Sequence, residues 1–226
     1  MHRRAQMKFV DVAGCPGCGK STLCYPLWAD KSVGWDGLPL PGEWQPFIAE
    51  IVKLFKLVRD HESFTAVVRM NDRTAKKMAT VFRMESELVF IQTGWLQRIL
   101  GFGWRLHQMG RDINLIRPAL WEMPVSVGVA FLEADLETLL QRNRDREKVP
   151  ATAHENRSFQ VPHMLACMPL TKAVLRERGV PIIEIDVQHQ SIDAARDQLF
   201  DFAYQGASYT EALRSSGEVA VLPASA

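Results

Sequence analysis

An eight-residue stretch near the start of the chain, Gly14-Cys15-Pro16-Gly17-Cys18-Gly19-Lys20-Ser21, has the pattern G-x-x-x-x-G-K-S. It follows an apolar run that reads as a strand and precedes residues that can open a helix, which is the context a phosphate-binding loop requires. Glycines let the backbone curl so that its N–H groups surround an anion. Lys20 can then reach the β- and γ-phosphates, and the Ser21 hydroxyl can ligate Mg²⁺. The sequence therefore predicts a site for ATP and Mg²⁺ built from residues Gly14 to Thr22.

The composition is compatible with one globular domain. The chain has 226 residues, 47% of them hydrophobic, and a formal net charge of +1. This length suits one sizeable core with a lid or small insert. The charge excludes a global basic field for non-specific nucleic-acid binding. No secretory leader or membrane-spanning run is evident. We therefore expect a cytoplasmic protein (host cytoplasm if viral), with one domain over 1–203 and a flexible tail over 204–226.

Cys15 and Cys18 also form a C-x-x-C pair, a pattern shared by redox sites and zinc half-sites. Both cysteines occupy positions of the phosphate loop that are free to vary. No second C-x-x-C or H-x-x-x-H supplies further ligands. The loop therefore accounts for the pair better than redox or zinc chemistry does.

Apolar runs and amphipathic stretches alternate along the chain, as in a parallel sheet covered by helices. Strands are predicted at 7–13, 32–35, 88–91, 125–132 and 181–185. Helices are predicted at 45–60, 73–84, 95–108, 112–122, 135–146, 163–178 and 191–203. In the helix at 45–60 one side carries Phe47, Ile48, Ile51, Val52, Phe55 and Val58. The alternation predicts an α/β fold.

Arginines occur at helical spacing after the fourth predicted strand. Arg142 and Arg146 lie four positions apart and share one helix face, whereas Arg144 is rotated away. Guanidinium groups at this place can clamp phosphates during transfer, although a solvated helix end is the alternative. Neither the N-K-x-D of GTPases nor the L-S-G-G-Q of transport ATPases is present. These features favour a kinase with Lys20, Arg142 and Arg146 as catalytic residues.

With these features the chain resembles the nucleoside-monophosphate-kinase-like family of phosphate-loop kinases. The similarity covers about residues 7–203, and its specific parts are the phosphate loop, the arginine-bearing helix and a final strand at 180–186. The resemblance implies a P-loop NTPase three-layer sandwich with about five parallel strands between helices. It also implies an ATP site at the strand carboxyl ends, a small lid at about 143–160 and an acceptor-binding region at about 36–84.

One position departs from the family pattern. Many relatives place Asp or Glu at the end of the third strand, where this chain has Gln92, and an amide cannot take a proton. The resemblance suggests Asp36 as the catalytic base, with an ordinary Asp-Gly turn as the alternative. Glu43 and Glu122 are further candidates for the base. Gln92 would then orient the acceptor or a magnesium-bound water.

Basic and aromatic residues are concentrated in the predicted acceptor region and just after it. A basic cluster occupies 69–83, and the segment 94–106 interleaves aromatic residues with arginines. Basic side chains can bind the phosphates of a nucleic acid, and aromatic rings can stack on a base extruded from it. The alternative is that the aromatic residues of 94–106 belong to the core and that 73–83 is a solvated amphipathic helix. The residues concerned are Arg69, Arg73, Lys76, Lys77 and Arg83 in the cluster, and Trp95, Arg98, Phe102, Trp104 and Arg105 in the segment.

Within the family, the stretch Gln92-Thr93-Gly94-Trp95-Leu96-Gln97-Arg98 resembles bacteriophage kinases that act on 5-hydroxymethyluracil in DNA. This resemblance implies DNA carrying a hydroxymethyl-pyrimidine as the acceptor, phosphorylated during base hypermodification. Gln92, Arg98, Arg105 and Arg73 would bind it. The alternative is a soluble (deoxy)nucleoside or nucleotide kinase acting on a small acceptor. A non-catalytic, nucleotide-dependent interaction protein is a further alternative, because Gln92 replaces an acid.

Overall fold

The computed structural model describes residues 8–24, 44–58, 88–91, 94–125, 127–147 and 158–215. Within them, four parallel strands form one sheet in the order β2-β1-β3-β4. The strands are β1 Lys8–Ala13, β2 Leu88–Ile91, β3 Gly128–Glu133 and β4 Ile182–Asp186. The strand expected at 32–35 lies outside the described residues.

The strand order creates a crevice at the carboxyl end of β1. From β1 the chain passes to β2 on one side and then crosses to β3 on the other, so Asp11 of β1 pairs in register with both Ile91 and Val129. In open parallel sheets ligands bind where the order reverses in this way, beyond the strand carboxyl ends. The phosphate loop follows β1 directly and therefore lies at this point.

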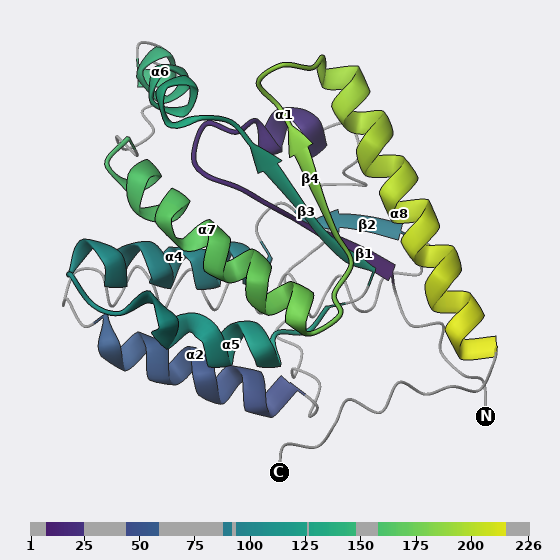
Figure 1. Ribbon diagram of the computed structural model, residues 1–226, viewed down its shortest axis with the longest axis horizontal. Helices are drawn as coiled ribbons and strands as arrows, with labels where there is room; N and C mark the ends of the chain where they lie inside the picture. The colour runs from purple at the N-terminus through teal and green to yellow at the C-terminus, as the bar shows by residue number, and fades with distance from the viewer. Residues whose placement is uncertain are drawn as a thin grey trace, which may run out of the picture.

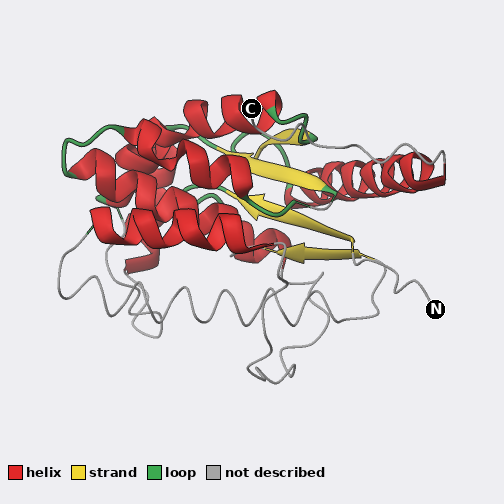
Figure 2. Ribbon diagram, turned by 90° about the horizontal axis from the view of Figure 1, so that it is seen from below, coloured by secondary structure: helices red, strands yellow, loops and turns green. Residues whose placement is uncertain are grey.

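Helices cover both faces of the sheet, which confirms the expected layered α/β fold (Figures 1 and 2). Helices α1 Lys20–Cys24 and α8 Ile192–Ser215 pack on one face. On the other face α4 Trp95–Gln108 packs against α7 Gln160–Glu177. Outside this layer lie α2 Gln45–Leu57, the 3₁₀ helix η3 Ile113–Ile116 and α5 Arg117–Glu122, while α6 Leu136–Glu147 follows the carboxyl end of β3.

The core fills the space between the sheet and these helices. All residues of β3 from Gly128 to Leu132 are buried, as expected for a strand covered on both faces. The predicted apolar side of α2 is only partly correct, because Val52 is 46% exposed and Leu54 is buried in its place. The helix turns Phe47, Ile51 and Leu54 inward toward α4 and α5.

The expected tail boundary at residue 204 is wrong, because α8 continues to Ser215. The packed face marked by the buried Leu199 and Ala203 extends past this boundary to Gly206, where an added Cβ would stand 2.6 Å from Val127 Cγ1. The small and polar residues of this segment suggested a tail, but spacing by three and four residues marks a packed face. No helix in the described part of the chain has the length and hydropathy to cross a membrane.

Candidate functional site

The phosphate loop joins β1 to α1 with the curled backbone that its sequence predicts. Gly17 and Gly19 have φ values of 90° and 87°, a region that residues with a side chain rarely enter. The Cys18 N–H donates to the Cys15 carbonyl at 3.3 Å, which closes the turn. Helix α1 begins at Lys20, so the loop opens onto the amino end of a helix.

The Lys20 ammonium lies inside the curl of the loop. Its Nζ donates to the carbonyls of Gly14 at 2.7 Å and Cys15 at 3.1 Å, and contacts Cys18 Sγ at 3.4 Å. These acceptors are weaker partners for an ammonium group than phosphate oxygens are. A triphosphate entering the loop would therefore compete for the Lys20 charge.

A pocket of about 290 Å³ adjoins the loop and includes Arg142 and Arg146, the two arginines predicted to clamp phosphates and called the lid arginines below. Arg142 and Arg146 of α6 line it together with the loop and the segment after β4. Arg142 also donates to the Val187 carbonyl at 2.8 Å, which fixes α6 against that segment. The other lining residues are Gly17, Cys18, Gly19, Thr22, Leu23, Asp145, Val187, Gln190, Ser191, Ile192 and Ala195.

Arg196 holds the far end of α1 in this arrangement. From α8 it donates to the Thr22 carbonyl at 3.2 Å and the Leu23 carbonyl at 3.5 Å, and it also bonds Asp193. A guanidinium group on these carbonyls completes the helix and opposes its negative end. The loop is thus supported by α8 from one side and by α6 from the other.

The acidic residues Glu133, which ends β3, and Asp135, which follows it, serve the local structure. Asp135 accepts from the Thr138 N–H at 2.7 Å, and this bond, the largest of several causes, lowers the pKa of its carboxyl. Its other oxygen accepts from Gln188 at 2.7 Å. Glu133 forms an ion pair with Lys172. Asp135 therefore begins α6, and Glu133 joins β3 to α7.

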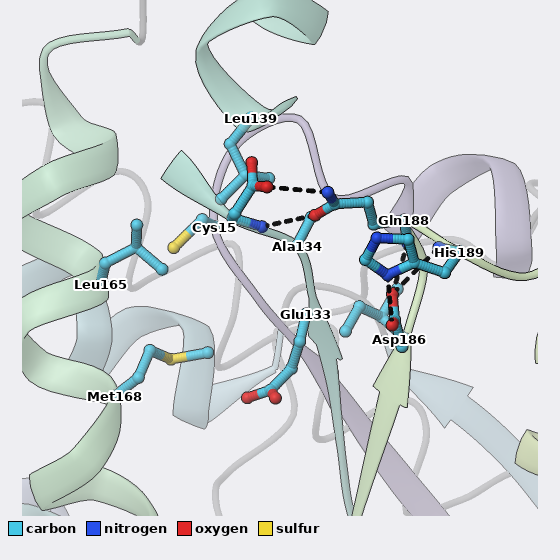
Figure 3. Close-up of a pocket in the computed structure, with 11 residues that line it drawn as sticks. Cys15, Glu133, Ala134, Leu139, Leu165, Met168, Asp186, Gln188 and His189 are labelled. Atoms are coloured by element: carbon cyan, nitrogen blue, oxygen red, sulfur yellow. Dashed lines mark hydrogen bonds and ion pairs between the residues drawn. The ribbon is translucent and has the colours of Figure 1, made fainter. Parts of the chain in front are cut away.

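These acids line a second pocket, of about 360 Å³, on the α7 side of the loop (Figure 3). Leu165 and Met168 of α7 face Cys15 across it, and the Gln188–Asp135 and His189–Asp186 contacts lie at its rim. Burial raises the pKa of the Cys15 thiol to about 12. The thiol is therefore neutral at physiological pH and lacks the thiolate character of a reactive redox cysteine.

The assignment of Ser21 to Mg²⁺ binding stays a prediction. It is exposed in the first turn of α1, next to Lys20. Mg²⁺ beside phosphates keeps several waters and takes few protein ligands, so one hydroxyl fits its chemistry. Among the described residues no group of three or more His, Cys, Asp or Glu side chains could hold a metal ion.

The aromatic side chains of the segment 94–106 belong to the core. Trp95 and Phe102 are each 1% exposed, and Trp95 packs edge-on against Phe47 with ring centroids 4.9 Å apart. Trp104 is buried too and packs against Phe159, the N-cap residue of α7. Of the two interpretations of this segment, the core helix is the correct one. These three rings cannot stack on an extruded base.

The arginines of that segment lie at the margin of this core. Arg98 and Arg105 are half-buried on α4, and the Arg105 guanidinium lies 4.9 Å from the Trp104 ring centroid. Their assignment to acceptor binding stays a prediction. The other predicted acceptor and base residues, Gln92, Asp36, Arg73 and Glu43, lie outside the described residues, as does the basic cluster at 69–83.

Glu122 does not lie beside the loop. It ends α5 before β3 begins, near the amino end of the sheet, where Arg178 bonds the carbonyls of Leu120 and Met123. The phosphate loop lies at the opposite, carboxyl end. Glu122 is therefore not a catalytic base for this site.

Three residues of the site were not found from the sequence. Asp11 of β1 is 3% exposed, and its carboxylate accepts from the Leu96 N–H at the start of α4. Gln97 of α4 accepts from the Gly14 N–H at 3.4 Å. Asn143 of α6 donates to the Pro16 carbonyl at 2.9 Å. Only Asp11 had a visible signal, a charge within an apolar strand run.

Comparisons with known proteins support the fold. No protein-family model and no curated protein matches the sequence. Solved structures of deoxyadenosine kinase from M. mycoides do match. One with product dCMP and a flexible dCDP bound has a TM-score of 0.51 at 13% identity, covering 87% of this chain and 99% of that one. One with bound dATP has a TM-score of 0.51 at 14% identity, covering 85% and 97%.

The chain has the fold of a phosphate-loop kinase. A third structure, the same kinase with bound dCTP, matches with a TM-score of 0.50 at 13% identity, covering 88% of this chain and all of that one. The phosphate-loop kinase fold places the loop, α6 and the segment after β4 around one pocket, as described above.

Proposed function

We propose that the protein is an ATP-dependent kinase that phosphorylates a hydroxyl group of a nucleoside or nucleotide. The observation that carries this proposal is the pocket shared by Gly17–Gly19, Arg142 and Arg146 at the strand-order reversal. In this pocket the phosphate loop, which we propose binds the phosphates, adjoins a cavity of about 290 Å³ and the guanidinium groups of Arg142 and Arg146. The likeness to deoxyadenosine kinase structures, which hold deoxynucleotides, supports a nucleoside or nucleotide acceptor.

The proposed reaction is an in-line transfer of the γ-phosphoryl group. The acceptor hydroxyl attacks phosphorus, the bond to the β-phosphate oxygen breaks, and ADP leaves. The loop amides and Lys20 hold the phosphates, Arg142 and Arg146 oppose the charge that develops on the oxygens, and Ser21 holds Mg²⁺. The hydroxyl proton passes to a carboxylate, for which Asp36 stays the candidate.

Hydroxymethyl-pyrimidine in DNA is the competing acceptor. The buried rings of Trp95 and Phe102 remove part of the argument for it, and the net charge of +1 gives no general attraction to DNA. The basic cluster at 69–83 and the resemblance around Gln92 remain in its favour. We therefore make this acceptor one arm of the test.

The test follows transfer of labelled γ-phosphate from ATP. Acceptors are free deoxynucleosides, deoxynucleoside monophosphates, DNA containing 5-hydroxymethyluracil and the same DNA unmodified, with Lys20→Ala as the control enzyme. We expect labelling of a free nucleoside or nucleotide by the wild type only. Selective labelling of the modified DNA would overturn the small acceptor. ATP binding without any transfer would favour the non-catalytic interaction protein.

A further inference from the structure

Asn143 connects helix α6 to the phosphate loop. It is 6% exposed, although its neighbours Arg144 and Asp145 are exposed. Its Nδ2 donates to the Leu139 carbonyl at 2.7 Å, one turn earlier in α6, and to the Pro16 carbonyl at 2.9 Å in the loop. Both protons of one amide are thus used, and one of them joins segments 127 positions apart.

Gly17 permits this close approach. A Cβ on Gly17 would stand 2.7 Å from Asn143 Nδ2 and 3.0 Å from the Leu139 carbonyl oxygen, closer than side chains tolerate. The φ of 90° at Gly17 separately disfavours any other residue. Gly17, at a variable position of the motif, therefore serves contact with α6 as well as curvature of the loop.

Helix α6, which carries Asn143, is itself held in place by contacts with its neighbours. Asp135 caps its first turn and bonds Gln188, and Arg142 bonds the Val187 carbonyl. The helix is therefore fixed to the segment after β4 at two places, through Asp135 before its first turn and through Arg142 in its second half. Asn143 links this fixed helix to the phosphate loop, because its amide donates a hydrogen bond to the carbonyl of Pro16 in the middle of the loop.

We propose that Asn143 is a positioning residue that holds the phosphate loop, through its amide donor, in the shape that receives the triphosphate. This inference rests on the proposed function. It assigns a role to the one inward-facing polar residue between the two lid arginines. Loss of the donor leaves a loop carbonyl without this partner and frees the curl to relax, so affinity for ATP should fall.

Three substitutions separate a donor role from mere packing. Asn143→Asp keeps the size but turns a carboxylate oxygen toward two carbonyl oxygens, which repels both. Asn143→Ala removes the donor without adding repulsion. Arg144→Ala, on the exposed side of the same helix, is the matched control. If the donor matters, Asp should be more harmful than Ala; if only packing matters, Asp should resemble the wild type.

The experiment measures hydrogen exchange at the loop amides of Cys15, Gly17, Cys18 and Gly19 without nucleotide, affinity for a fluorescent ATP analogue, and kcat and KM. We expect faster loop exchange and about tenfold weaker ATP binding in Asn143→Ala, a larger loss in Asn143→Asp, and no change in Arg144→Ala. KM for ATP should rise more than kcat falls, and KM for the acceptor should stay constant.

Unchanged loop exchange in Asn143→Ala, or wild-type behaviour of Asn143→Asp, would overturn the proposal. Thermal unfolding of each variant shows whether it is folded, and if Asn143→Asp is not, Asn143→Ala carries the test. Hydrogen exchange in the loop is measured without ATP or acceptor, so it tests the role of Asn143 independently of catalysis. If the wild-type protein had no kinase activity, that result would contradict the proposed function but not the role of Asn143.

Discussion

Gly94 and Asp11 lie so close that a Cβ on Gly94 would stand 2.4 Å from Asp11 Oδ2. Gly94 is the N-cap residue of α4 and has no side chain to cap the helix. The carboxylate of Asp11, from the neighbouring strand, accepts from the Leu96 N–H in its place. A side-chain oxygen that accepts from an N–H of the first turn satisfies a donor that the helix itself leaves unpaired, which gives this buried aspartate a structural role.

Substitution of Gly94 by alanine should therefore destabilise the protein. The added methyl group must displace a buried carboxylate or the start of α4, an overpacking that costs about 1–3 kcal/mol. Chemical denaturation should show a lower midpoint for Gly94→Ala. Gly101→Ala is the control, since a Cβ there meets nothing within 4 Å. Equal midpoints for the two variants would contradict the close contact.

Lys20→Ala should abolish most of the proposed phosphotransfer. The ammonium that lies within the loop would no longer oppose charge on the transferring phosphoryl group, so kcat should fall by about a hundredfold or more. Circular dichroism should stay unchanged, because Lys20 bonds only acceptors of its own loop among its recorded contacts. Near-normal turnover would contradict the role of this loop in transfer.

The two lid arginines should differ in their effects. Both line the 290 Å³ pocket beside the phosphate loop, but Arg142 also bonds the Val187 carbonyl. Arg146→Ala should lower kcat more than it weakens ATP binding, because a group that opposes transition-state charge acts mainly on kcat. Arg142→Ala should lower kcat and also weaken ATP binding, since it loosens α6. Steady-state kinetics would give kcat for each variant, and calorimetry would give its affinity for ATP. If kcat is unchanged in both variants, the arginines do not act in transfer and belong to a solvated helix end.

Stability should decrease at alkaline pH in a way that depends on Cys15. Burial raises the pKa of this thiol to about 12, whereas an exposed thiol ionises near about 8.5. The unfolded chain therefore loses the proton first, and the contribution to stability is complete below about pH 8.5 and decreases as the pH rises toward 12. The Cys15→Ser variant has a hydroxyl that does not ionise in this range, so its denaturation midpoint should fall less between pH 8 and 10 than that of the wild type. An equal fall of the midpoint in both proteins would contradict the prediction.

Local patterns predicted the elements of the fold well. The strand expected at 88–91 is β2, and the helix expected at 95–108 is α4, with the same limits. The glycine and lysine positions of the loop also lie within one short stretch, so the curled backbone and the inward ammonium follow from neighbouring residues. Such features are visible in sequence because their causes are local.

Two further features depended on the tertiary structure. The tryptophans of α4 suited either a base-stacking surface or a core, and the tertiary structure decides for the core, because Phe47 packs on Trp95 and Phe159 packs on Trp104. Asn143 read as one polar residue among arginines, yet it bonds the loop across 127 positions. The sequence by itself determined the phosphate loop and the α/β alternation, because each arises from adjacent residues. The partners of Asp11, Gly17 and Asn143 were decided only when the folded chain brought distant segments together.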